Sequence, residues 1–227
     1  MDDALPDEAL PDEPLLVESR PLPVEGRLGR QLAFLIEVDR LKTVLRASTL
    51  AAVDRRENDA EHSWHLALMV PVLAEYADEP IDVGHTIRLV VVHDLVEIYA
   101  GDTPLYDDRL RTSQVERELA AADRLFGLLP PDQASEFRAL WDEFEARETP
   151  EARFAKAIDR LEPNLLNWMA GGGTWQTPGV TADTVRTRTA HIGEASGALG
   201  EAMTALIGAA ERNGWVAPGQ QGVTGPA

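Results

Sequence analysis

The residues with the clearest chemical potential are His93, Asp94 and Glu97, in the segment VVVHDLVEIYAGD at 90–102. Successive residues of an α-helix are about 100° apart, so a helix would turn these three side chains to one sector and leave the opposite side apolar. An imidazole and two carboxylates are costly to bury unless an ion pair or a metal ion compensates their charge. Because Arg88 lies on a different face of this helix, the pattern favours a divalent cation.

Two other segments offer the ligands that such a cation would still need. His62 lies in the first turn of a predicted helix, in AEHSWHLALM at 60–69. Asp159 lies inside an otherwise apolar helical stripe, in AKAIDRLEP at 155–163. The alternatives are a surface or capping role for His62 and an ordinary ion pair for Asp159. His65, three residues after His62, is expected to pack or to hydrogen-bond behind the ligands.

Helical periodicity covers most of the chain and positions these candidates. No alternating apolar and polar run bounded by turn residues indicates a strand. We therefore expect an all-α fold with one helical domain over 27–213. Helices are predicted over 28–47, 61–77, 83–100, 113–128, 131–147, 150–170 and 182–212, with Thr149 as the N-cap of the sixth and a glycine-rich loop at 171–180.

The two ends of the chain differ from this helical part in composition. Residues 1–25 hold eight acidic side chains and one basic one, with a tandem ALPDE repeat at 4–13 and several prolines. Like charges and proline oppose folding, so we expect a disordered leader over 1–26. The segment 214–227 has no charge and is rich in Gly, Pro and Gln, which predicts a flexible tail.

Composition excludes several classes of partner. The formal net charge is −18 and only two lysines occur, so no basic surface is expected for long nucleic acid. The longest apolar run, Leu66 to Ala74, is far shorter than the roughly 20 residues of a membrane helix. The chain has no cysteine, which excludes disulfides and thiolate sites. We expect a cytoplasmic location with no membrane partner.

In chain order, His62, His93-Asp94 and Asp159 resemble the H…HD…D signature of the HD-domain phosphohydrolases. The similarity is closest to the branch that contains bacterial 5′-deoxynucleotidases and their eukaryotic relatives. It extends over roughly residues 30–210 and rests on four strings in the family's order: LKTVLR at 41–46, RRENDAEHSW at 55–64, HDLVEIYAGDTP at 93–104 and IDRLEP at 158–163.

The resemblance implies a metal-dependent hydrolase of small phosphorylated substrates, namely a 5′-nucleotidase acting on nucleoside 5′-monophosphates. It implies a homodimer and one divalent ion (Mn²⁺, Co²⁺, Fe²⁺ or Mg²⁺), since two nitrogens and two oxygens with open positions suit these metals. The residue roles that it implies are metal ligation by His62, His93, Asp94 and Asp159, proton transfer by Glu97 and Asp102, and substrate binding by Arg46, with Arg55 and Arg56 as weaker candidates.

One departure from the family limits what the resemblance carries over. In the bacterial deoxynucleotidases a tryptophan follows the substrate arginine, whereas Ala47 follows Arg46 here, so selectivity for deoxyribose is not inferred.

Trp175, in the loop 171–180, is a candidate to cover the site or to stack on a base. The alternatives are a phosphodiesterase or pyrophosphohydrolase using the same metal site, and a non-catalytic nucleotide-binding module. The complete set of ligands and acidic residues argues against the last.

Overall fold

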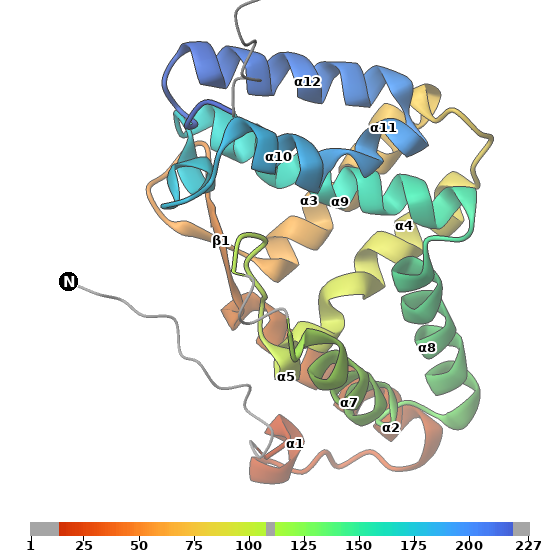
Figure 1. Cartoon of the computed structure of the whole chain (residues 1–227). Coiled ribbons are helices and arrows are strands. Elements are labelled where there is room, and N and C mark those ends of the chain that lie inside the picture. The colour runs from red at the N-terminus through yellow and green to blue at the C-terminus, as the bar shows by residue number, and fades with distance from the viewer. Residues whose placement is uncertain (1–13, 108–111, 220–227) are drawn as a thin grey trace, which may run out of the picture.

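The computed structural model describes residues 14–107 and 112–219, which form helices and one two-stranded sheet (Figure 1). The predicted all-α fold class is confirmed. The α-helices are α1 (Leu16–Ser19), α2 (Gly26–Val38), α3 (Asp59–Leu73), α4 (Val83–Val92), α5 (Glu97–Ala100), α7 (Gln114–Phe126), α8 (Pro131–Ala146), α9 (Pro150–Met169), α10 (Ala182–Thr189), α11 (His191–Ala195) and α12 (Gly197–Arg212). Short 3₁₀ helices are η1 (Asp39–Thr43), η2 (Ala74–Tyr76), η3 (His93–Val96) and η4 (Gly173–Gln176). The strands are β1 (Leu45–Thr49) and β2 (Arg56–Asn58).

Helix α9 is the central element, because α3, α4, α8 and α11 all pack against it. Its Phe154 and Ile158 are buried together with Leu66 of α3 and Leu89 of α4. The predicted N-cap is observed: the Thr149 hydroxyl accepts a hydrogen bond from the Ala152 N–H at 3.1 Å. Figure 1 shows α10 and α12 along one side of α9, with α2, α5 and α7 gathered at the far end of the molecule.

The first predicted helix, 28–47, is too long, because α2 ends at Val38 and η1 and β1 follow. β-Branched residues such as Val44 and Thr49 favour extended backbone, and β1 gains an antiparallel partner in β2, with Leu45 opposite Asn58. Asn58 then starts α3 through a capping box with Glu61. Arg46 therefore projects from a strand and not from a helix.

The predicted helix 83–100 is interrupted at the residues that matter chemically. Helix α4 ends at Val92, η3 spans His93–Val96, and α5 resumes at Glu97. The chain then leaves the helix through Gly101, whose φ of 73° favours glycine. A Cβ at Gly101 would meet no atom within 4 Å. The role of Gly101 is therefore to allow this backbone conformation, because there is room for a side chain at this position.

The predicted helix 182–212 is three helices, α10, α11 and α12. Ser196 has extended backbone and its hydroxyl caps α12 by accepting from the Leu199 N–H at 3.2 Å. Gly193 and Gly200 let α11 and α12 approach closely, since a Cβ on Gly200 would lie 2.6 Å from the Gly193 Cα. Gly193, Ser196 and Gly200 thus allow a change of direction inside the predicted helix.

Parts of both predicted disordered ends are described and are packed. The Leu16 N–H donates to Glu37 at 2.7 Å, so α1 lies against α2. Val216 is buried, and the Ala182 N–H donates to the Ala217 carbonyl at 2.8 Å. The tandem repeat at 4–13 and the segment 220–227 lie outside the described residues. No described helix has the length and apolar character needed to span a membrane.

Candidate metal centre and active site

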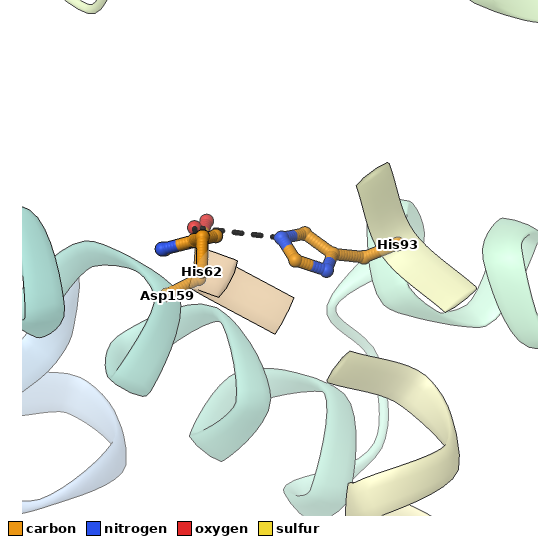
Figure 2. A group of neighbouring side chains, drawn as sticks. All are labelled: His62, His93 and Asp159. Atoms are coloured by element: carbon orange, nitrogen blue, oxygen red, sulfur yellow. Dashed lines mark hydrogen bonds and ion pairs between the residues drawn. The ribbon is translucent and has the colours of Figure 1, made fainter. Parts of the chain in front are cut away.

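The four predicted metal ligands meet where α3, η3 and α9 converge. The Asp159 Oδ1 atom lies 3.2 Å from the His62 Nε2 atom and 3.6 Å from the His93 Nε2 atom (Figure 2). The Asp94 Oδ1 atom lies 2.9 Å from His93 Nε2. All four side chains are buried. The structure thus brings together two nitrogens and two carboxylate oxygens from residues up to 97 positions apart in the chain.

The electrostatics of this group fit a bound cation. Burial alone would lower the pKa of His93, but the carboxylates of Asp94 and Asp159 raise it to about 10. The His93 Nε2 atom is buried and makes no hydrogen bond with the described residues. Buried polar atoms are usually partnered, so an unpartnered nitrogen that faces two carboxylates is the feature expected of a metal ligand. The donor set suits Mn²⁺, Fe²⁺, Co²⁺ or Mg²⁺ better than a closed structural zinc site.

The outward nitrogen of each predicted ligand histidine has its own acceptor. The Nδ1 atom of His93 lies 2.8 Å from the Val90 carbonyl oxygen one turn earlier on α4. The Nδ1 atom of His62 lies 3.1 Å from the Glu162 Oε2 atom on α9. A ring nitrogen that donates outward leaves the other nitrogen free to bind metal. Both rings therefore direct Nε2 toward the centre.

The outward oxygen of each ligand aspartate faces a cation. The Asp94 Oδ2 atom accepts from the Arg46 Nη1 atom at 2.8 Å. The Asp159 Oδ2 atom lies 3.8 Å from the Lys156 Nζ atom, which also donates to Glu145 at 3.1 Å. These cations offset part of the acidic charge and leave the Oδ1 atoms directed at the histidines.

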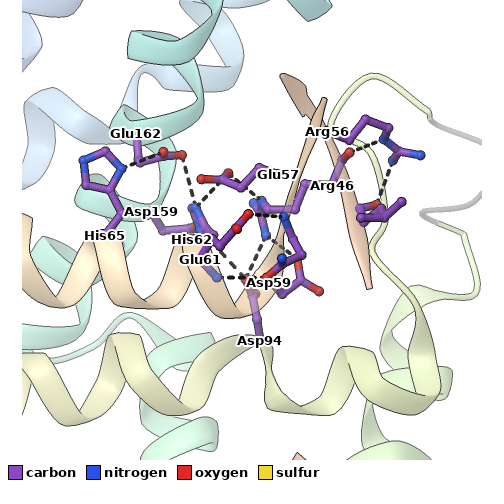
Figure 3. A network of polar contacts seen from close by, with 12 residues as sticks. Arg46, Arg56, Glu57, Asp59, Glu61, His62, His65, Asp94, Asp159 and Glu162 are labelled. Carbon is purple, nitrogen blue, oxygen red and sulfur yellow. Dashed lines mark hydrogen bonds and ion pairs between the residues drawn. The ribbon is translucent and has the colours of Figure 1, made fainter. Parts of the chain in front are cut away.

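Arg46 reaches the centre from β1 and contacts a set of acidic residues (Figure 3). Besides Asp94, its Nη1 atom lies 3.2 Å from the Asp59 Oδ1 atom, and its Nε atom lies 3.8 Å from the Glu57 Oε2 atom. The side chain also lines the cavity that opens over the ligands. Arg46 is thus fixed by carboxylates beside the metal ligands, and its guanidinium borders the space where a substrate would lie.

Glu97 and Asp102 both line the same cavity. Burial raises the pKa of Glu97 well above its ordinary value, and the carboxylates of Asp94 and Asp59 raise it further. Burial also raises the pKa of Asp102, against the opposing effect of the Arg46 guanidinium. The Glu97 Oε2 atom is buried and makes no hydrogen bond with any residue that the structure describes. Two carboxyl groups with raised pKa values beside a phosphate-sized space have the chemistry of general acid–base groups.

The cavity has a volume of about 200 Å³ and continues from the ligands between two walls. Trp141 and Glu145 of α8 line one wall, and Thr174 and Thr177 of the glycine-rich loop line the other. Trp175 is only 1% exposed, and its Nε1 donates to the Asn164 Oδ1 atom at 2.9 Å. Trp175 therefore anchors the loop to α9 and does not present its ring to a base.

Sequence reasoning missed three residues that contact the predicted site residues: Asp59 and Glu162, which are buried, and Lys156, which is half-buried. Each lies within three residues of a predicted ligand, and that proximity was the available signal.

Arg55 and Arg56, the weaker candidates for substrate binding, have other partners. Arg55 pairs with Glu61 at 2.6 Å on the surface, and Arg56 donates to the Leu45 carbonyl of β1 at 2.7 Å. Neither arginine is directed at the ligands.

Comparison with known proteins supports the resemblance seen in the sequence. The family model described as HD domain matches residues 38–199. The 5′-deoxynucleotidase HDDC2 of Bos taurus is 34% identical over 141 residues, which cover 61% of this chain and 67% of that protein. The Homo sapiens protein of the same name is 33% identical over 132 residues, which cover 58% of this chain and 63% of that protein.

A solved structure is similar over most of both chains. The predicted metal-dependent phosphohydrolase from Magnetospirillum magnetotacticum MS-1 is 52% identical with a TM-score of 0.82, covering 87% of this chain and 99% of that one. The matched segment spans less than two thirds of the Homo sapiens relative's length. The resemblance to HD-domain phosphohydrolases inferred from the sequence is confirmed.

Proposed function

The chain belongs to the HD domain family, and on this premise we propose that it is a metal-dependent phosphohydrolase that releases phosphate from nucleoside 5′-monophosphates. The observation that carries the proposal is the convergence of His62, His93, Asp94 and Asp159 beneath a cavity lined by Arg46, Glu97 and Asp102. The relatives named 5′-deoxynucleotidase support a monophosphate substrate. Whether the sugar is ribose or deoxyribose is left open by Ala47 beside Arg46.

The chemistry divides between the bound ion and the side chains. A divalent ion held by the four ligands would polarise a phosphoryl oxygen and lower the pKa of water. Arg46 would hold the phosphate dianion with its planar guanidinium. The oxygen of a water forms the new bond to phosphorus as the bond from phosphorus to O5′ breaks. Of Glu97 and Asp102, one takes the proton lost by the water and the other gives a proton to O5′.

Several finer properties belong to the same proposal. The ion is Mn²⁺, Co²⁺, Fe²⁺ or Mg²⁺, the protein is a homodimer, and it acts in the cytoplasm on a small phosphorylated substrate. The donor set supports these metals. The family resemblance supports the dimer, and the absence of cysteine from the sequence accords with the location.

The test is hydrolysis of a panel of ribo- and deoxynucleoside 5′-monophosphates after chelation and readdition of Mn²⁺, Co²⁺ or Mg²⁺. We expect metal-dependent release of orthophosphate and the nucleoside. No release from any member would contradict the proposal. A parallel assay with a nucleotide phosphodiester and a nucleoside triphosphate separates the alternatives, because a phosphodiesterase or a pyrophosphohydrolase would prefer one of those substrates.

A further inference from the structure

Behind the metal centre, on the side away from the cavity, α3 and α9 are joined through one buried carboxylate. Glu162 is fully buried and its two oxygens have different partners. The Oε2 atom lies 3.1 Å from the Nδ1 atom of the ligand His62, and the Oε1 atom lies 3.0 Å from the Nδ1 atom of His65 (Figure 3). His65 is half-buried and reaches solvent at the edge of α3. One carboxylate thus connects a metal ligand to the surface.

We propose that Glu162 is a positioning residue, which fixes His62 as the Nδ1–H tautomer, and that His65 holds Glu162 in place from the solvent side. This inference rests on the proposed metal at His62. A histidine that donates from Nδ1 must present its lone pair at Nε2, the atom that lies 3.2 Å from Asp159. Without an acceptor at Nδ1, the buried ring could protonate Nε2 instead and lose its ligand function.

The surroundings of Glu162 agree with this role. The side chain is fully buried, and its two oxygens lie 3.1 Å and 3.0 Å from the Nδ1 atoms of His62 and His65. A buried carboxylate in this position is satisfied by accepting a hydrogen bond from each ring. Charge-assisted bonds of this kind are stronger than neutral ones and hold the ring orientation more firmly.

A separate cation bound by Glu57, His65 and Glu162 is the competing interpretation, because their donor atoms lie within 4.8 Å of one another. Both Glu162 oxygens already accept from histidines, which favours positioning over ligation. Glu57 makes no hydrogen bond through its buried Oε2 atom, which lies 3.7 Å from His62 Nδ1. Glu57 is not among the residues that line the cavity.

The sharpest variant is Glu162→Gln, which keeps size and shape. A glutamine has one oxygen acceptor and one NH₂ donor, so it can accept from only one of the two Nδ1–H groups. We expect Co²⁺ affinity, measured by titration calorimetry and by the visible absorption of Co²⁺, to fall about 10- to 100-fold. His65→Gln leaves the bond between His62 and Glu162, so its expected loss is at most a few-fold.

Glu37→Gln is the matched control, because Glu37 is also fully buried and accepts through both oxygens, but on α2 away from the ligands. It should leave Co²⁺ affinity within about 2-fold of wild type. A larger loss in Glu162→Gln than in Glu37→Gln then reflects lost positioning of His62 and not a general loss of stability. A second measurement needs no variant. Nitrogen-15 NMR of wild type loaded with the diamagnetic ion Mg²⁺ should show His62 protonated at Nδ1 and not at Nε2.

The outcomes separate this inference from the proposed function. Unchanged Co²⁺ affinity in Glu162→Gln, or an Nε2–H tautomer of His62 in wild type, overturns the positioning role while the metal centre stands. A second equivalent of Co²⁺ that disappears in His65→Gln would instead establish the separate cation site and overturn the inference. Absence of Co²⁺ binding by wild type would overturn the proposed function, and the inference with it.

Discussion

Two buried glutamates, Glu37 on α2 and Glu97 on α5, differ in how their carboxylates are partnered. The Glu37 Oε1 atom accepts from the Tyr99 hydroxyl at 2.9 Å and lies 2.7 Å from the Arg40 Nε atom. Its Oε2 atom accepts from the Leu16 N–H at 2.7 Å. The Glu97 Oε2 atom, by contrast, is buried without a hydrogen bond within the described structure.

The difference separates a structural carboxylate from one arranged for a ligand. At Glu37 the protein supplies every donor, so the charge stabilises the packing of α1 and α5 against α2. Around Glu97, the carboxylates of Asp59 and Asp94 approach within 4.8 Å of it. Arg46 pairs with Asp59 and Asp94, and His93 lies 2.9 Å from Asp94. Such a group is costly in the free protein, and a bound cation or a proton would relieve the repulsion.

The largest expected effect comes from removing ligands. In a His93→Ala, Asp94→Ala double variant, metal binding should be lost and phosphate release should fall on the order of 1,000-fold or more, since a catalytic metal supplies several kcal/mol. Calorimetric titration with Mn²⁺ and the phosphate-release assay measure the two effects. His85→Ala is the control, because His85 lies in the first turn of α4 and pairs with Glu143 of α8. Activity retained by the double variant would exclude this centre as the active site.

The next largest effect is expected from the matched pair of variants Glu97→Gln and Glu37→Gln. Glu97→Gln should lower kcat about 100- to 10,000-fold by removing a proton-transfer group, yet leave the free energy of unfolding unchanged or higher. Glu37→Gln should do the reverse: it weakens hydrogen bonds to a charged acceptor and costs about 1–3 kcal/mol, with kcat unchanged. Urea unfolding and steady-state kinetics measure both. If the two variants behaved alike, the distinction drawn between the glutamates would be wrong.

A smaller and different effect is expected at Arg46. Arg46→Lys keeps the charge but loses the planar guanidinium, so KM should rise about 10-fold or more, with a smaller change in kcat. Arg55→Lys is the matched control, because Arg55 is exposed and pairs with the surface residue Glu61. A KM for Arg46→Lys equal to that of wild type would remove Arg46 from substrate binding.

The sequence allowed candidate ligands to be named, but it predicted the elements that carry them less accurately. His62, Asp94 and Asp159 could be named because acidic and imidazole side chains stand out within apolar helical stripes. The convergence of α3, η3 and α9 on one centre could not be obtained from helical periodicity, which gives the buried face of each helix but not its neighbours. The order of motifs shared with the family supplied that information.

What could not be predicted depends on contacts between distant segments. Strand β1 forms because β2 pairs with it, whereas the local sequence around Arg46 alone predicts that the preceding helix continues. Ser196 ends one helix and caps the next through a hydrogen bond that requires the turn already to be formed. Glu162 appeared as one more polar residue of α9 until both of its histidine partners on α3 were located.

The smallest expected effect is a change in the pH dependence of stability at Asp59. Burial raises the pKa of Asp59 to about 7 in the folded protein, and Asp94 adds to the shift while Arg46 opposes it. An unfolded aspartate has a pKa of about 3.9, so the folded state binds the proton more tightly. The stability that this provides is fully present below the unfolded pKa and is lost as the pH rises through 7.

Metal-free wild type should therefore become less stable between pH 6 and pH 8, with Asp59 contributing at most about 1.4 kcal/mol per pH unit. Asp59→Asn stays neutral and should make this slope shallower, as measured by urea unfolding at both pH values. Asp132→Asn is the control: hydrogen bonding to Arg27 lowers the pKa of this exposed carboxyl to about 2, so its titration is complete well below pH 6. Equal slopes of stability against pH in wild type and Asp59→Asn would show that Asp59 is ionised across this range. Arg46 would then compensate the charge of this carboxylate as fully as its hydrogen-bond donors compensate the charge of Glu37.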